Sequence, residues 1–266
     1  MNQTPPNPNE TSPPAPNQSQ QAAPPPRPAV RVVSAVRDRR PWVTWGLMAL
    51  TILIYVVQYA STNLLGHDLP VLFGAKVNNL IISGQYWRLI TPTFLHGSIL
   101  HIGFNMYALY VIGPDLEQYY GRMHYLALYL LSGFGGNVAS FLLTPSSSLG
   151  ASTAVFGLIA AQGIFVYLNR ALFGKRSKAL LTNIAMIVVI NLALGLSPGI
   201  DNWGHLGGLL AGALFAWLSG PVLSMRQEPG ELVVENKRAA SSPWGHAFLV
   251  FAIFLLIALA KITFGS

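Results

Sequence analysis

The 266-residue sequence lacks cysteine and is poor in charged residues. Without cysteine, disulfide bonds, thiolate metal sites and a cysteine nucleophile are excluded. Charged residues make up only 9% of the chain and apolar residues 52%, whereas a soluble domain has roughly one quarter charged residues. Because the apolar residues lie in stretches close to the roughly 20 residues that span a bilayer, the composition predicts a polytopic membrane protein.

Two kinds of hydrolytic site are also missing. None of the nine carboxylates lies in the middle of an apolar stretch, so a paired-aspartate site has no candidates. None of the six histidines is followed by glutamate, so the H-E-x-x-H zinc motif is absent, and we expect neither a metal nor another cofactor. The remaining hydrolytic option is a hydroxyl nucleophile with a histidine.

The chain divides into a polar tail and a series of apolar segments. Residues 1–41 are rich in Pro, Asn, Gln and Ser and are predicted to be disordered. The apolar segments should be helices, because lipid cannot hydrogen-bond a bare backbone. Their expected ranges are 42–61, 92–112, 123–143, 150–169, 179–197, 203–222 and 243–264. The prediction is an all-α polytopic membrane fold of seven helices, with a loop at 223–242 before the last helical segment at 243–266.

Helix start signals and positive charges refine this prediction. Thr91-Pro92 and Asp201 or Asn202 are typical of the starts of the second and sixth helices. Of the sixteen positive residues, thirteen lie in the tail and in alternate loops. This bias predicts a cytoplasmic N-terminus and accounts for the net charge of +7 without a nucleic-acid partner. The 62–91 connection then becomes an external loop, long enough to have structure of its own.

Four polar side chains are expected in the outer half of the membrane. They are His96 and His101 in the second segment, Ser152 in the fourth and His205 in the sixth. Because an intramembrane histidine is costly unless it is paired or faces water, a cavity that opens outward is the simplest account. Taken singly, each residue is also compatible with a local backbone partner near a helix end.

Glycines surround the predicted serine and histidine. Gly204, Gly208 and Gly212 recur every four residues and form a small-residue stripe that allows close helix packing. The stripe is compatible with a packing role alone. Close packing would also bring the Ser152 hydroxyl within the ~3 Å that His205 needs to accept its proton.

Acyl transfer needs donors for the developing oxyanion. His101 and Asn105 are four residues apart and share one helix face, so they are candidates together with the backbone N–H of Ser152. The pair is equally compatible with an interhelical hydrogen-bonding element. Asp201, four residues before His205, is interpreted as a helix cap rather than as a third catalytic residue.

At this point residues 42–222 resemble the rhomboid family. The matching motifs are Trp87-Arg88, His96 with His101 and Asn105, Glu117 with Gly121-Arg122, Gly150-Ala151-Ser152, and Gly204-His205 with Gly208 and Gly212. Taken by themselves, Trp87 is compatible with an interfacial anchor and Glu117 with a residue at the cytoplasmic end that ties helices together.

The resemblance implies a six-helix catalytic core over residues 42–222, with residues 243–266 as an additional C-terminal helix. It also implies an intramembrane serine endopeptidase that cleaves transmembrane proteins near the outer membrane surface. A Ser152–His205 dyad would act through an acyl-enzyme, with His101, Asn105 and the Ser152 N–H at the oxyanion. His96 would lie nearby, and Gly150 and Gly208 would support the site. We expect a multi-pass protein of a bacterial plasma membrane, in contact with lipid and membrane-protein substrates; the sequence does not indicate an oligomeric state.

Two departures from the family pattern lie beside the serine. Thr153 replaces a glycine that commonly follows the nucleophile, and its β-branch could crowd the oxyanion pocket. Phe156 stands where some members have tyrosine against the histidine, so the aromatic face is kept and a hydroxyl is lost.

Two other functions compete with this interpretation. A rhomboid-like protein without activity would bind membrane clients, but Ser152 and His205 are both present. A small proton transporter would use the histidines, but it would need polar residues through both halves of the membrane.

Overall fold

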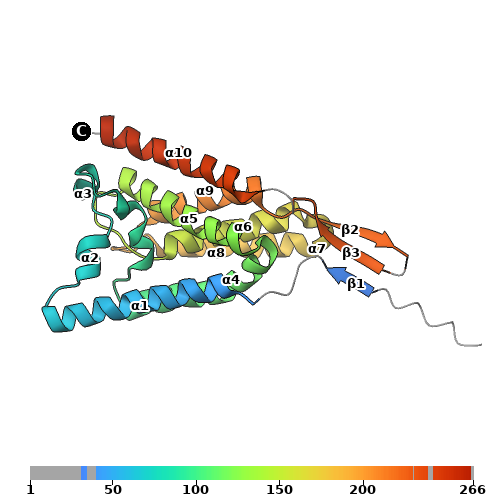
Figure 1. Cartoon of the computed structure of the whole chain (residues 1–266), viewed down its shortest axis with the longest axis horizontal. Coiled ribbons are helices and arrows are strands. Elements are labelled where there is room, and N and C mark those ends of the chain that lie inside the picture. The colour runs from blue at the N-terminus through green and yellow to red at the C-terminus, as the bar shows by residue number, and fades with distance from the viewer. Residues whose placement is uncertain (1–30, 35–39, 230, 239–241, 265–266) are drawn as a thin grey trace, which may run out of the picture.

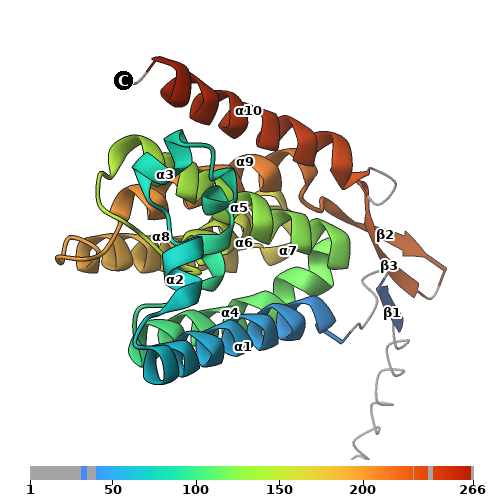
Figure 2. The ribbon, with the colours of Figure 1, turned by 60° about the vertical axis from the view of Figure 1, so that its left-hand side comes forward.

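The computed structural model describes residues 31–34, 40–229, 231–238 and 242–264. Long helices run side by side in a bundle (Figures 1 and 2). They are α1 (Trp42–Leu65), α4 (Ile99–Tyr120), α5 (Arg122–Leu143), α6 (Ser152–Leu168), α8 (Arg176–Leu194), α9 (Asn202–Ser219) and α10 (Pro243–Phe264). Among the described residues α1, α5, α8 and α10 are long and apolar enough to cross a membrane, and α6 is a shorter apolar helix. The predicted all-α polytopic fold, with a six-helix core and a C-terminal helix, is confirmed.

Helices α5, α6 and α9 form the centre of the bundle. They pack on one another, while α1 and α4 lie together on one side and α10 covers α5 and α9 (Figure 2). The fully buried side chains of this core include Leu109, Leu128, Tyr129, Leu158 and Phe215. Helix α8 packs mainly on α6, and none of its residues is buried.

The buried face of α1 is largely polar. Thr44, Thr51 and Gln58, seven residues apart, turn toward the bundle, while apolar side chains such as Leu53 and Val56 are exposed. In water this pattern would be unfavourable. In lipid it is expected, because apolar side chains on the outer face contact lipid, while polar groups find hydrogen-bond partners only inside the bundle.

The two ends of the bundle carry different short elements (Figure 1). One end, called the α2–α3 end below, holds α2 (Leu69–Gly74), α3 (Asn78–Ile82) and the 3-10 turns η1 (Tyr86–Leu89) and η2 (Thr91–Phe94). The opposite end, called the sheet end, holds β1 (Arg31–Ser34), β2 (Leu223–Glu228) and β3 (Glu231–Asn236). The short helix α7 (Arg170–Phe173) follows α6 at the same end.

The 62–91 connection has structure of its own, as predicted. Arg88 is buried and donates to the Ala75 carbonyl at 2.7 Å and to the Leu72 carbonyl at 2.6 Å, at the C-terminal end of α2. A cation is favourable at this position because the last carbonyls of a helix lack backbone partners. The Trp87 indole donates to the Phe73 carbonyl at 2.9 Å. Together these two side chains fix α2 to η1.

The prediction for the start of the second membrane helix was wrong. Thr91-Pro92 begins the turn η2, and α4 begins only at Ile99, after Ser98, whose hydroxyl accepts the His101 N–H at 3.2 Å. A proline at the first position suits a 3-10 turn as well as an α-helix. His96 therefore precedes the helix instead of lying within it.

The three-stranded sheet was also missed. Strands β2 and β3 form an antiparallel hairpin, and β1 pairs parallel with β3, in the order β1-β3-β2. The segment 223–242, predicted as a loop, contains two of these strands, and Arg31–Ser34, within the predicted tail, form the third. The remainder of the predicted disordered tail, up to residue 39, lies outside the described residues.

Glu117 ties the sheet end of α4 to the start of α1. Its carboxylate accepts the backbone N–H groups of Val43 at 3.0 Å and Thr44 at 2.8 Å, and the Thr44 hydroxyl at 2.8 Å. The Arg122 guanidinium lies 3.9 Å away. The carboxylate thus satisfies donors at the N-terminus of α1, where negative charge is favoured, and the expectation that Glu117 ties helices together is confirmed.

Candidate active site

Ser152 and His205 meet at the α2–α3 end of the bundle. Ser152 is the first residue of α6, and His205 lies in the first turn of α9. The Ser152 Oγ is 2.9 Å from the His205 Nε2. A hydroxyl at this distance from an imidazole nitrogen is within reach of proton transfer.

Glycines allow α6 and α9 to approach this closely. A Cβ atom on Gly208 would lie 2.0 Å from the Thr153 carbonyl oxygen, and one on Gly212 would lie 2.4 Å from the Gly157 Cα. In both cases the obstructing atoms belong to the backbone of α6. The small-residue stripe predicted from the sequence is therefore the surface on which the two helices pack.

The His205 ring is held by an aromatic neighbour. Phe156, one turn after Ser152, stacks on it with ring centroids 4.4 Å apart and an interplanar angle of 9°. The aromatic face expected at Phe156 is thus present. Within the described part of the chain, His205 Nδ1 has no hydrogen-bond partner.

Asp201 does not supply that partner. Its carboxylate accepts the Gly204 N–H at 3.0 Å and caps α9. It also accepts the hydroxyls of Ser140 and Thr144 from α5 and its C-terminal cap. Burial alone would raise the pKa of the Asp201 carboxyl, but these hydrogen bonds outweigh burial and hold the pKa below its ordinary value. The helix-cap interpretation is confirmed.

The backbone before Ser152 is shaped by Gly150. This residue has φ +134°, and its N–H donates to the Pro92 carbonyl at 2.9 Å. A Cβ atom here would lie 2.6 Å from the His101 Nε2. Glycine thus satisfies a backbone conformation that other residues rarely adopt, and it lets the His101 ring lie against the chain that leads to the serine.

The other predicted polar residues lie around this point. The His96 and His101 rings are edge to face with centroids 5.0 Å apart, and the His96 Nε2 accepts the Ala151 N–H at 3.4 Å. Asn105 is buried one turn further along α4, and its Nδ2 donates to the His101 carbonyl at 2.9 Å. The structure therefore places His96 and His101 beside Ser152, while the Asn105 amide is bonded within its own helix.

Thr153 points toward α5 and α9. Its Cβ would be 2.5 Å from a Cβ on Gly136 of α5, and its methyl group 3.2 Å from one on Gly204 of α9. The β-branch expected to crowd the oxyanion pocket thus occupies the space that these two glycines leave.

Sequence reasoning missed Gln58 of α1. Its Nε2 donates to the His96 carbonyl at 3.0 Å and to Asp68 at 2.9 Å, and its Oε1 accepts the His96 N–H at 3.0 Å. One amide therefore holds both backbone groups of His96. The available signal was the amide itself, since a polar side chain in an apolar span needs a partner.

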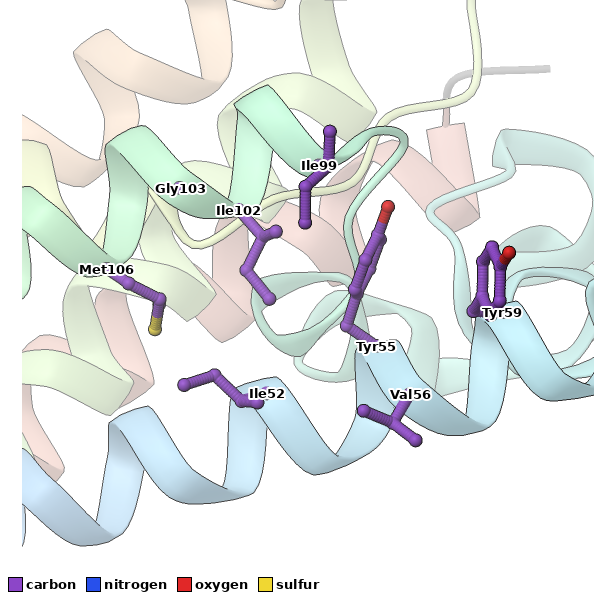
Figure 3. A pocket seen from close by; sticks show the side chains of 8 residues that line it. All are labelled: Ile52, Tyr55, Val56, Tyr59, Ile99, Ile102, Gly103 and Met106. Atoms are coloured by element: carbon purple, nitrogen blue, oxygen red, sulfur yellow. The ribbon is translucent and has the colours of Figure 1, made fainter.

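A separate apolar groove lies between α1 and α4 (Figure 3). Its volume is about 570 Å³, and its lining consists of Ile52, Tyr55, Val56, Tyr59, Ile99, Ile102, Gly103 and Met106. Ser152 and His205 are not part of this lining. Among the described residues, no group of three or more His, Asp or Glu side chains is placed to hold a metal ion.

The fold and the site define a class: a multi-pass membrane bundle with a serine and a histidine in contact at one end. The family model described as Rhomboid domain matches residues 83–222. The chain is 40% identical over 177 residues to Rhomboid protease GluP of Bacillus subtilis (strain 168). The aligned region covers 66% of this chain and 34% of GluP. The chain belongs to the rhomboid family.

Two further relatives extend this comparison. RHOMBOID-like protein 5 of Arabidopsis thaliana is 32% identical over 291 residues, covering 92% of this chain and 91% of that protein. Rhomboid protease AarA of Providencia stuartii is 32% identical over 197 residues, covering 65% of this chain and 70% of that protein. The chain thus spans about a third of the length of GluP but nearly all of RHOMBOID-like protein 5.

Proposed function

We propose that this protein is an intramembrane serine endopeptidase that cleaves transmembrane proteins. The observation that carries the proposal is the 2.9 Å distance between the Ser152 Oγ and the His205 Nε2. A nucleophile and a base in contact are the minimal requirement for covalent acyl transfer. Membership of the rhomboid family, with relatives that are named rhomboid proteases, supports the same activity.

In the first half of the reaction the His205 Nε2 accepts the Ser152 proton. The Ser152 Oγ attacks the scissile carbonyl carbon and forms a tetrahedral oxyanion. His205 then gives the proton to the amide nitrogen, the C–N bond breaks and the new amine leaves. The product is an ester between Ser152 and the N-terminal part of the substrate.

In the second half a water molecule replaces the amine. The His205 Nε2 takes a proton from the water, the resulting hydroxide attacks the ester, and the proton returns to the Ser152 oxygen as the new carboxyl group leaves. The stack against Phe156 keeps the imidazole in one plane through both halves.

The oxyanion would be held by His101, Asn105 and the Ser152 N–H. The His101 ring lies against Gly150, two residues before the serine. The Asn105 amide would exchange its 2.9 Å bond to the His101 carbonyl for a bond to the oxyanion. Such donors often reach their final geometry only in the substrate complex. His96 supports the site by accepting the Ala151 N–H.

The substrate would reach the serine sideways from the membrane. Helix α8 packs mainly on α6 and has no buried residue, and it does not pack closely on α4 within the described residues, so entry between α4 and α8 is the route that we propose. Because a helical peptide bond is shielded, the substrate must unwind locally. We therefore expect cleavage where a substrate span carries small or helix-weakening residues.

The cleavage site would lie near the outer surface of a bacterial plasma membrane. This follows if the N-terminus is cytoplasmic, as the positive residues indicate, because α1 then carries the α2–α3 end outside. The chain lacks cysteine, so single cysteines at Ser83 and Lys175 can be tested with a maleimide that does not cross membranes. Labelling of Ser83→Cys but not Lys175→Cys in intact cells is expected; the reverse pattern would contradict this orientation.

Cleavage of a panel of single-span proteins in liposomes, with mass measurement of the products, tests the activity. The parent should release fragments cut at one position, and Ser152→Ala should release none. Ser147→Ala is the matched control, because this exposed serine lies in the loop that leads to Ser152. This variant should cleave the substrate at the parental rate. Binding of panel members without cleavage would instead favour a client-binding protein.

A further inference from the structure

A lysine without any exposed surface binds the loop that leads to Ser152. The Lys76 ammonium donates to the carbonyls of Thr144 at 2.7 Å and Ser146 at 2.6 Å, and to the Asn78 side chain at 3.1 Å. The Lys76 backbone also pairs with Ser148 in both directions, at 3.0 and 3.1 Å. Burying an ammonium group is costly unless its donors are satisfied. Here the charge is used to hold one short segment, residues 144–148.

The same segment is held from its other side by Asp201. The Thr144 hydroxyl donates to the Asp201 carboxylate at 2.7 Å, while the Thr144 carbonyl accepts from Lys76. The Ser140 hydroxyl also donates to Asp201 and lies 3.3 Å from the Ser148 hydroxyl. The cation and the carboxylate are therefore joined through Thr144, and a second path runs through the two serines.

Lys76 binds the segment that leads to Ser152, called the Ser152 arm (residues 144–152), and Asp201 belongs to the segment that leads to His205, called the His205 arm (residues 201–205). Residues 144–148 lead within four residues to Ser152. Asp201 caps α9, and its carbonyl accepts the His205 N–H at 3.1 Å. Any shift between the 144–148 segment and the start of α9 is thus a shift between the serine and the histidine.

We propose that Lys76 and Asp201 form a positioning pair that fixes the Ser152 arm against the His205 arm. The proposal rests on the proposed function. Neither side chain touches the reacting atoms: Asp201 bonds to Gly204, Ser140 and Thr144, and Lys76 to carbonyls of the loop. Both act by setting the distance across which the proton moves, and a small error in that distance is costly for the rate.

The test compares labelling of Ser152 by a fluorophosphonate in full-length variants, together with kcat, KM and the melting temperature. Lys76→Met and Asp201→Ala should each slow labelling and lower kcat by about tenfold to a hundredfold, the size expected for a misplaced reacting group, with KM nearly unchanged. Lys175→Met, a change at an exposed lysine, is the matched control and should label at the parental rate.

The conservative variant separates positioning from an electrostatic role. Asp201→Asn keeps a side-chain oxygen for the Gly204 N–H and the Thr144 hydroxyl, so it should label within about threefold of the parent. If Asp201→Asn is as slow as Asp201→Ala, the carboxylate charge acts on His205 itself and the positioning pair is wrong. Parental labelling rates in Lys76→Met and Asp201→Ala, measured below their melting temperatures, would also overturn it.

A further variant keeps the test decisive if Lys76→Met does not fold. Thr144→Val removes only the hydroxyl that joins the segment to Asp201 and leaves the carbonyl that Lys76 binds. It should slow labelling by about three- to tenfold, as for one lost hydrogen bond; an unchanged rate contradicts the pair. If Ser152→Ala is labelled as fast as the parent, the proposed function and this proposal are both overturned. If Lys76→Met, Asp201→Ala and Thr144→Val are labelled at the parental rate, only this proposal is overturned.

Discussion

Adding one methyl group at Gly208 should separate the serine from the histidine. The new Cβ atom would lie 2.0 Å from the Thr153 carbonyl oxygen, which is 1.4 Å short of the 3.4 Å at which ordinary contact begins (3.4 minus 2.0). The obstructing atoms are backbone, so no side-chain rotation relieves the clash. If α6 and α9 move apart by this amount, the 2.9 Å contact between Ser152 and His205 lengthens to about 4 Å, beyond hydrogen-bond distance.

Gly208→Ala should therefore lower both activity and stability. We expect the cleavage rate to fall by at least about a hundredfold, because a reacting group displaced by about 1 Å commonly costs that much. Overpacking should also cost about 1–3 kcal/mol of folding free energy. The assay is cleavage of a single-span substrate in liposomes at a temperature below the melting temperature of the variant, so that loss of fold does not imitate loss of rate.

Gly103→Ala is the matched control for this change. Gly103 lies in α4, and a Cβ atom there would have nothing within 4 Å. Its replacement should leave the rate unchanged and raise stability by up to about 1 kcal/mol through helix propensity. A Gly208→Ala enzyme that cleaves at the parental rate would refute the claim that the glycine stripe sets the distance between Ser152 and His205.

Three other predictions concern the oxyanion, the sheet end and the buried lysine. Asn105→Ala should lower kcat by about 10²–10³ with little change in KM, as for other oxyanion donors; a rise in KM with kcat unchanged would point to a binding role instead. Glu117→Ala should lower the melting temperature in detergent, because it leaves the N–H groups at the start of α1 and the Thr44 hydroxyl without their acceptor; an unchanged melting temperature would contradict this anchor. Burial lowers the pKa of Lys76 to about 8, while Asp201 partly opposes the shift. The unfolded chain therefore keeps this proton to higher pH than the folded chain, so stability rises as pH increases through the interval between about 8 and the ordinary lysine value. The melting temperature of the parent, relative to that of Lys76→Met, should accordingly rise between about pH 7 and about pH 10. A difference that stays constant over this range would contradict the lowered pKa of Lys76.

The membrane helices were predictable because lipid imposes their length and composition. The closeness of α6 and α9 was also visible in the sequence, since Gly204, Gly208 and Gly212 repeat at helical spacing. The start of α4 was not, because Pro92 suits the first position of a 3-10 turn as well as that of an α-helix, and the Ser98 cap competes with it.

Contacts between residues far apart in the sequence could not be predicted from a sequence pattern. The bonds from Gln58 to His96 and from Lys76 to Thr144 join residues 38 and 68 positions apart, and no local periodicity relates them. The β2–β3 hairpin had a usable signal, since Pro229-Gly230 is a typical turn between two short strand-like stretches. That signal was outweighed by the expectation of an all-helical chain.

The central claim is that His205 activates Ser152 across the interface of α6 and α9. The most direct measurement is the rate at which a fluorophosphonate forms an adduct, located by peptide mass mapping, in the parent and in His205→Ala. The account predicts an adduct on Ser152 in the parent and a rate lower by several orders of magnitude in folded His205→Ala. Equal rates in the two proteins, or an adduct on another residue, would contradict it.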